Sequence, residues 1–188
     1  MPRFSFYVAL ALLASPAAAL SPETTAELRA GAVGPMGKLV VHDAPRAPVE
    51  AVFRDEEGRE RSFSDWPGEV VFVNIWATWC APCLKEMPAI DRMAAAFAGA
   101  PLRVVAISTD RGDPEKPRRW LAENGVSNLD FYHDGAWAVP QAFAVLGQPT
   151  TLILDRRGRE VARLMGEAEW DAPEARAVIR AVIEDEAE

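Results

Sequence analysis

The sequence predicts an α/β domain with a mixed central sheet and helices on both of its faces. Runs of β-branched and aromatic residues alternate with amphipathic, helix-like segments from about residue 49 to residue 183. The last segments read as a hairpin followed by a helix, so antiparallel strands are expected beside the parallel ones. A length of 188 residues suits one domain with a sizeable core.

The first 19 residues are expected to be a signal peptide rather than part of the fold. Arg3 gives a short positive start, residues 4–13 are an apolar core, and residues 17–19 fit a small-residue cleavage site. Export would place the protein in the periplasm, an oxidising compartment. An uncleaved membrane anchor is the alternative, although the apolar core is shorter than the ~20 residues that a membrane span usually needs.

Residues 20–48 are rich in Ala, Gly and Pro, and we expect a short helix and an irregular arm there. The predicted domain occupies residues 49–188 and begins with a hairpin. The two strands of this hairpin, 49–53 and 60–63, flank the turn sequence Asp55-Glu56-Glu57-Gly58.

The centre of the domain is a buried strand over residues 70–76, which leads through a turn into a helix over residues 80–98. A second buried strand is expected over residues 102–107. The remaining predicted helices cover 114–124, 136–146 and 173–183, and the remaining strands cover 129–132, 150–154 and 159–165, the last two paired as a hairpin.

Composition and charge disfavour two classes of partner. Hydrophobic residues make up 49% of the chain and charged residues 26%, which is ordinary for a soluble globular domain. The 20 basic and 28 acidic residues give a net charge of −8, and no basic patch interrupts the acidic balance. We therefore expect neither nucleic acid nor an anionic membrane surface as a partner.

The only two cysteines, Cys80 and Cys83, are separated by two residues on the predicted turn between strand and helix. A bridge over so short a loop removes little entropy from the unfolded chain, so it stabilises a fold poorly. A zinc site needs four ligands, and His42 and His133 show no ligand spacing relative to the pair. We therefore predict a redox-active dithiol; two unrelated structural cysteines are the alternative.

Cys80 is predicted to begin the helix and to be the attacking thiol. The unpaired N–H groups and the partial positive charge of a helix N-terminus favour the thiolate, which is the nucleophile in disulfide exchange. Pro82 fits the first turn, where its missing N–H costs nothing. Cys83 is then the resolving thiol that releases a mixed disulfide.

The segment from Asn74 to Cys83, followed by Glu86-Met87-Pro88, resembles the TlpA/ResA/CcmG group of thioredoxin-like proteins, and the TlpA branch most closely. Residues 147–158 carry the same resemblance, which extends from about residue 47 to residue 183. It implies a thioredoxin-like fold with an N-terminal β-hairpin extension. It also implies an extracytoplasmic thiol:disulfide oxidoreductase, usually acting as a reductant, and no cofactor is expected.

The resemblance also implies roles for residues around the cysteines. Pro149 should follow a cis peptide bond after Gln148 and lie against the cysteine pair, where the preceding backbone can pair with an extended substrate. The family usually has an apolar residue at the position of Gln148. Trp79 is expected to be exposed and to contact substrate, with Trp66 nearby and Trp76 in the core.

Glu86 lies three residues after Cys83, one helical turn on, so the two side chains share a face of the helix. The resemblance implies a half-buried carboxylate that takes or gives the proton of the resolving thiol. Thioredoxins use an aspartate on the preceding strand for this, and that position is Asn74 here, which cannot titrate. An acid that is merely favoured near a helix N-terminus is the alternative interpretation.

The resemblance implies client proteins of the apocytochrome or copper-chaperone type, in cytochrome c or cytochrome oxidase copper-site biogenesis. A membrane electron donor would re-reduce the dithiol. One alternative is a copper-binding chaperone of the same fold, with Cys80, Cys83 and His133 as ligands, although such proteins usually space their cysteines by three residues. Another is a thiol peroxidase, which would need an isolated peroxidatic cysteine in a different motif.

Overall fold

The structure is a computed structural model that describes residues 20–185. The helices are α1 (Pro22–Gly31), α2 (Ala81–Ala96), α3 (Glu115–Glu123), α4 (Ala138–Ala142) and α5 (Pro173–Glu184), with 3₁₀ turns at Gly34–Met36 and Phe63–Asp65. The strands are β1 (Leu39–Arg46), β2 (Phe53–Arg54), β3 (Glu60–Arg61), β4 (Val70–Trp76), β5 (Leu102–Ser108), β6 (Tyr132–His133), β7 (Thr150–Leu154) and β8 (Glu160–Met165).

The eight strands form a sheet in the order β1-β8-β7-β4-β5-β6-β2-β3. Strands β4, β5 and β6 are parallel, whereas β7 pairs antiparallel with β4 and β8 pairs antiparallel with β7. Strands β2 and β3 form the predicted N-terminal hairpin. The sheet is therefore mixed, as the sequence predicts, and the fold is thioredoxin-like.

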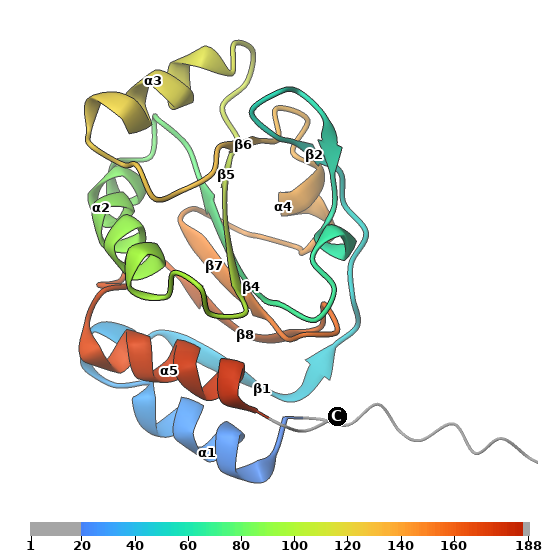
Figure 1. Cartoon of the computed structure of the whole chain (residues 1–188), viewed down its shortest axis with the longest axis vertical. Helices are drawn as coiled ribbons and strands as arrows, with labels where there is room; N and C mark the ends of the chain where they lie inside the picture. Colours follow the sequence, from blue (N-terminus) through green and yellow to red (C-terminus); the bar gives the residue numbers. More distant parts are fainter. Residues whose placement is uncertain (1–19, 186–188) are drawn as a thin grey trace, which may run out of the picture.

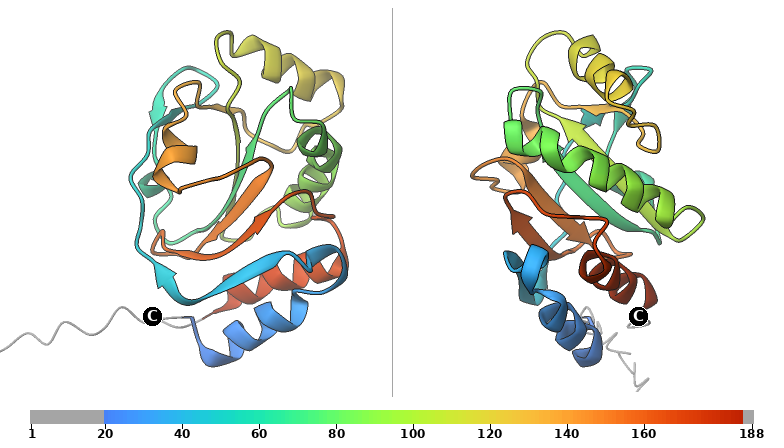
Figure 2. Two further views of the ribbon diagram at one scale, coloured as in Figure 1. Left: turned by 180° about the vertical axis from the view of Figure 1, so that it is seen from behind. Right: turned by 90° about the vertical axis from the view of Figure 1, so that its left-hand side faces the viewer.

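Helices cover both faces of this sheet (Figures 1 and 2). Helices α2, α3 and α5 pack on one face, with α1 beside α5, and α4 packs on the other. Side chains of β4 alternate between the two cores: Phe72 and Trp76 face the first, and Val73 and Ile75 face the second. Every residue of β4 is buried, because the strand is central and covered on both sides.

Most predicted elements are present within a few residues of their expected bounds, but α4 is much shorter than the expected helix over residues 136–146. It holds 5 residues. Trp137 just before it and Ala144 just after it have positive φ angles of 63° and 49°. Backbone in this region cannot continue a right-handed helix, so the helix is limited at both ends.

The prediction of an irregular arm over residues 20–48 is wrong in its second half. The helix is present as α1, but β1 pairs antiparallel with β8 at the edge of the sheet. Buried Glu160 of β8 contacts His42 Nε2 of β1 at 2.5 Å, so a side-chain contact also holds the two strands together. Pro45 obscures this strand in the sequence, since proline is tolerated only on edge strands and at bulges. The sheet thus begins before residue 49.

The expected signal peptide, residues 1–19, lies outside the described residues. Within residues 20–185, none of the helices combines the length and the apolar character that crossing a membrane requires.

Candidate active site

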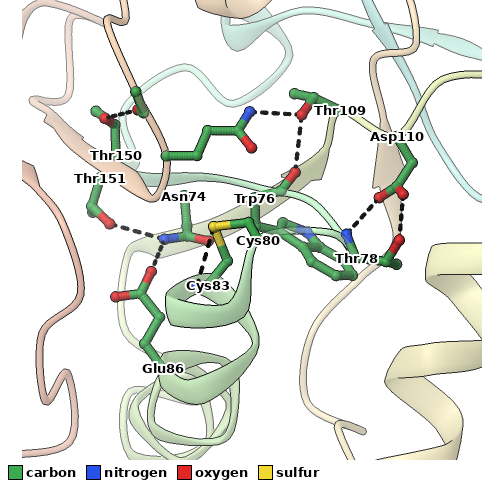
Figure 3. Close-up of a disulfide and its surroundings, with 12 residues drawn as sticks. Asn74, Trp76, Thr78, Cys80, Cys83, Glu86, Thr109, Asp110, Thr150 and Thr151 are labelled. Carbon is green, nitrogen blue, oxygen red and sulfur yellow. Dashed lines mark hydrogen bonds between the residues drawn. A yellow bond between two sulfur atoms is a disulfide. The ribbon is translucent and has the colours of Figure 1, made fainter.

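The cysteine pair lies between the end of β4 and the start of α2, on the predicted strand-to-helix turn (Figure 3). Cys80 caps the helix, and a disulfide joins it to Cys83 in the first turn. The Cys83 N–H donates to the Cys80 sulfur at 3.3 Å. Cys83 is fully buried, whereas Cys80 is 5% exposed. The helix N-terminus therefore favours negative charge on the Cys80 sulfur, which belongs to the less deeply buried cysteine of the pair.

A buried carboxylate, Asp110, holds the turn that precedes Cys80. The Thr78 N–H donates to Asp110 Oδ2 at 2.8 Å, the Thr78 hydroxyl donates to Oδ1, and the Ser108 hydroxyl donates to Oδ2 at 3.0 Å. Burial raises the pKa of Asp110, but the bonds from Thr78 and Ser108 and the charge of Lys116 together outweigh it and keep this pKa below its usual value. The ionised carboxylate thus fixes the turn from which Trp79 projects, with 60% of Trp79 exposed.

The loop before β7 carries the cis peptide bond between Gln148 and Pro149, which confirms that expectation. Gln148 Nε2 donates to Thr109 Oγ1 at 2.7 Å, and the Thr109 hydroxyl donates to the Trp76 carbonyl at 3.2 Å. Gln148, at a position where the family usually has an apolar residue, therefore links this loop to the end of β4, next to the cysteine turn.

Glu86 of α2 is only 3% exposed and is surrounded by hydrogen-bond donors. Its Oε1 accepts from Asn74 Nδ2 at 2.8 Å, and its Oε2 accepts from the Ala168 N–H at 3.0 Å and from Trp170 Nε1 at 3.2 Å. Burial raises the pKa of Glu86 from 4.5 to about 7, and the three donors only partly oppose this. A carboxyl group with such a pKa can gain or lose a proton near neutral pH.

The raised pKa of Glu86 predicts a pH-dependent stability. Between pH 4.5 and about 7 the folded protein holds a proton on Glu86 that the unfolded chain has released, so the free energy of unfolding falls as pH rises. The total loss from this group is about 3 kcal/mol. Urea unfolding of the oxidised wild type and of Glu86→Gln at pH 4.5, 6 and 8 measures it, because glutamine does not titrate.

The quantity to compare is the stability difference between the two proteins, since other carboxylates change with pH in both. Between pH 4.5 and pH 8, the free energy of unfolding of Glu86→Gln should rise by about 3 kcal/mol relative to that of the wild type. The exposed Glu169→Gln provides a matched control and should show no such trend. A Glu86→Gln difference that is constant with pH contradicts the raised pKa.

The tryptophan side chains lie in different surroundings. Trp76 is fully buried, as expected, but Trp66 packs against Phe53 and Tyr132 in the core on the α4 side of the sheet rather than at the dithiol. Trp170 is fully buried and is a direct partner of Glu86. No local pattern signals this contact, because 84 residues separate the two side chains.

The structure does not assemble the copper-ligand set of Cys80, Cys83 and His133. His133 Nε2 lies 2.7 Å from the backbone carbonyl of Asp110. Within the described part of the chain, no three His, Cys, Asp or Glu side chains are grouped so as to hold a metal ion.

A dithiol that can open and close at the end of a central strand is the working part of thiol-disulfide oxidoreductases with a thioredoxin-like fold, and this protein belongs to that class. Similarity to known proteins agrees. The chain is 31% identical over 122 residues to the thiol-disulfide oxidoreductase ResA of Geobacillus thermodenitrificans, covering 65% of this chain and 68% of the relative. It is 35% identical over 102 residues to the thioredoxin-like protein YneN of Bacillus subtilis, covering 54% and 59% of the two chains.

Among solved structures, a thiol:disulfide interchange protein DsbE from Chlorobium tepidum aligns with a TM-score of 0.66 at 25% identity, over 75% of this chain and 98% of that one. The match to the ResA relatives spans about two thirds of their length. The sequence profile of the AhpC/TSA family matches residues 40–162, and the chain belongs to this family.

Proposed function

We propose that the protein reduces disulfides of partner proteins outside the cytoplasm, with Cys80 as nucleophile, Cys83 as resolving thiol and Glu86 as the proton acceptor of Cys83. The observation that carries this proposal is the pairing of a fully buried Cys83 with a buried carboxyl group one helical turn away, whose pKa of about 7 suits proton exchange with a thiol. A disulfide that only stabilised the fold would need no such group.

The reaction proceeds in two exchanges. The Cys80 thiolate attacks one sulfur of the client disulfide, so a Cys80–client bond forms, the client S–S bond breaks, and one client thiolate leaves. The Cys83 thiol then passes its proton to Glu86 and attacks the Cys80 sulfur. The Cys80–Cys83 disulfide forms as the second client sulfur leaves as a thiolate, which takes up a proton. The client gains two electrons and the dithiol loses two.

The positions of the other residues support roles in holding the client. Exposed Trp79 offers an apolar contact beside Cys80, and the Gln148–Pro149 backbone offers a place for an extended client segment. Leu146, just before that loop, is 89% exposed and adds apolar surface.

The signal-peptide pattern of residues 1–19 supports a periplasmic location, and the resemblance of the cysteine motif to the TlpA/ResA/CcmG group supports a role in cytochrome biogenesis. Clients would be apocytochromes or copper chaperones. A reductant in an oxidising compartment must be recharged, so a membrane electron donor is part of the proposal.

Replacing Glu86 by Gln should slow exchange by about 100-fold and flatten its pH profile, because general acid–base catalysis typically contributes at least that much. The effect should fall on release of the mixed disulfide more than on the attack by Cys80. Stopped-flow reduction of a disulfide peptide between pH 5 and 9 separates the two phases. Glu169→Gln, a change at an exposed neighbouring acid, is the control. Identical pH–rate curves for Glu86→Gln and wild type would contradict the role of Glu86 as proton acceptor.

A further inference from the structure

Asn74 is a buried amide whose nitrogen makes two hydrogen bonds and whose oxygen makes none among the described residues. It is 0% exposed in the middle of β4. Its Nδ2 donates to Glu86 Oε1 at 2.8 Å and to Thr151 Oγ1 at 3.0 Å. Its Oδ1 is buried and has no hydrogen-bond partner among the described residues. A buried carbonyl without a donor is costly, and turning the amide so that Oδ1 accepts a hydrogen bond removes that cost from the oxygen.

The two oxygens of Glu86 face different surroundings. Oε2 already accepts from two N–H groups, of Ala168 and Trp170, neither of which can accept a proton in return. A proton on Oε2 would point at donors. The neutral acid therefore carries its proton on Oε1, and the group that faces Oε1 is the Asn74 amide. In Figure 3 the Asn74 side chain lies between the Glu86 carboxyl group and the cysteine pair.

A protonated Oε1 facing the Asn74 NH₂ group would again set donor against donor. Rotation of the amide by half a turn replaces Nδ2 by Oδ1, which accepts the Oε1–H. Thr151 tolerates both orientations, because its hydroxyl can accept from Nδ2 in one and donate to Oδ1 in the other.

We propose that Asn74 is a positioning residue whose amide reverses as Glu86 gains or loses its proton, donating through Nδ2 to the carboxylate and accepting through Oδ1 from the acid. Asn74 thereby keeps Oε1 in one place in both states. When Oε1 gains a proton the amide turns, and it turns back when the proton leaves. Only the use of this device in exchange rests on the proposed function.

The direct test uses the full chain in its oxidised form, in which the disulfide cysteines do not titrate. The other charged groups near Glu86 are Glu167, which raises its pKa, and Lys85, which pairs with Glu167 at 2.6 Å. NMR of wild type between pH 5.5 and 8.5 follows the Glu86 carboxyl carbon and the contacts of the Asn74 NH₂ protons with Thr151. These contacts should be present above the Glu86 midpoint and lost below it. Contacts that persist throughout the titration overturn the proposal.

Two variants test the same idea through the midpoint of Glu86. Trp170→Phe removes a donor that serves only the carboxylate, so the midpoint should rise by about one pH unit. Asn74→Leu removes a group that hydrogen-bonds both the carboxylate and the neutral acid, so the midpoint of Glu86 should rise by less. This holds although the Asn74–Glu86 contact is shorter than the Trp170–Glu86 contact. A larger rise in Asn74→Leu than in Trp170→Phe indicates a fixed donor and contradicts the reversal.

The wild-type measurement does not depend on whether Asn74→Leu folds. It also needs no client and no turnover, so it can succeed even if Glu86 proves unimportant for exchange. Conversely, a slow Glu86→Gln variant together with an amide that never turns would support the proposed function and reject this inference.

Discussion

A Cys83→Ala variant should accumulate as a mixed disulfide with its client through Cys80, whereas Cys80→Ala should form no adduct and lose turnover roughly a thousandfold or more. Cys80 is the less deeply buried cysteine of the pair and accepts the Cys83 N–H, so it is the one expected to attack an outside disulfide. Cys83 is fully buried and bonded to Cys80, so an outside disulfide does not reach it. Incubating each reduced variant with oxidised periplasmic proteins, followed by non-reducing electrophoresis and mass spectrometry, measures the adduct and identifies the client.

The two alanine variants are a matched pair, because each removes one sulfur from the same turn. Alkylation of reduced wild type with limiting iodoacetamide gives an independent measurement and should label mainly Cys80. Trapping by Cys80→Ala, or labelling mainly at Cys83, would reverse the assignment of the two thiols.

The standard potential of the Cys80–Cys83 couple should lie near that of thioredoxin, about −270 mV, rather than near that of DsbA, about −120 mV. The two residues between the cysteines are Ala81 and Pro82, and neither stabilises a thiolate as an intervening histidine can. A less stabilised thiolate means a less stable reduced form, hence a lower potential. The ~150 mV between the two references corresponds to ~7 kcal/mol for two electrons, so the outcomes are well separated.

Equilibration with glutathione or dithiothreitol buffers, followed by quantification of free thiol, measures this potential. A value above about −160 mV, more oxidising than protein disulfide isomerase, would favour an oxidase of exported proteins over a reductant. An Ala81→His variant is a useful comparison, since it should move the potential upward by the mechanism argued here.

The sequence predicts the centre of this protein well because its signals there are local. The all-apolar run of β4, the cysteine spacing and the helix after it are contiguous in the chain, and the cis bond before Pro149 belongs to a recognisable motif. Edge structure is harder to predict. Strand β1 contains Pro45 and pairs on one side only, so neither alternation nor propensity indicates it.

The surroundings of Glu86 show the same limit within the site. Its position one turn after Cys83 is visible in the sequence, but its burial and its donors are not. Trp170 and the Ala168 N–H come from the loop between β8 and α5, more than 80 residues away, and only the folded chain brings them to the carboxyl group. The pKa of Glu86 is set by these long-range contacts.

The placement of β1 also bears on whether the sheets of two molecules can pair edge to edge. Without β1, one whole side of β8 would present unpaired N–H and C=O groups, a template on which a strand of another molecule can add. In this protein β1 pairs with that side of β8, so β1 becomes the edge strand of the sheet. Strand β1 is irregular, with a register shift between Val41 and Arg46 and a proline between them. An irregular edge strand pairs poorly with a further strand, so the N-terminal segment disfavours edge-to-edge pairing between molecules.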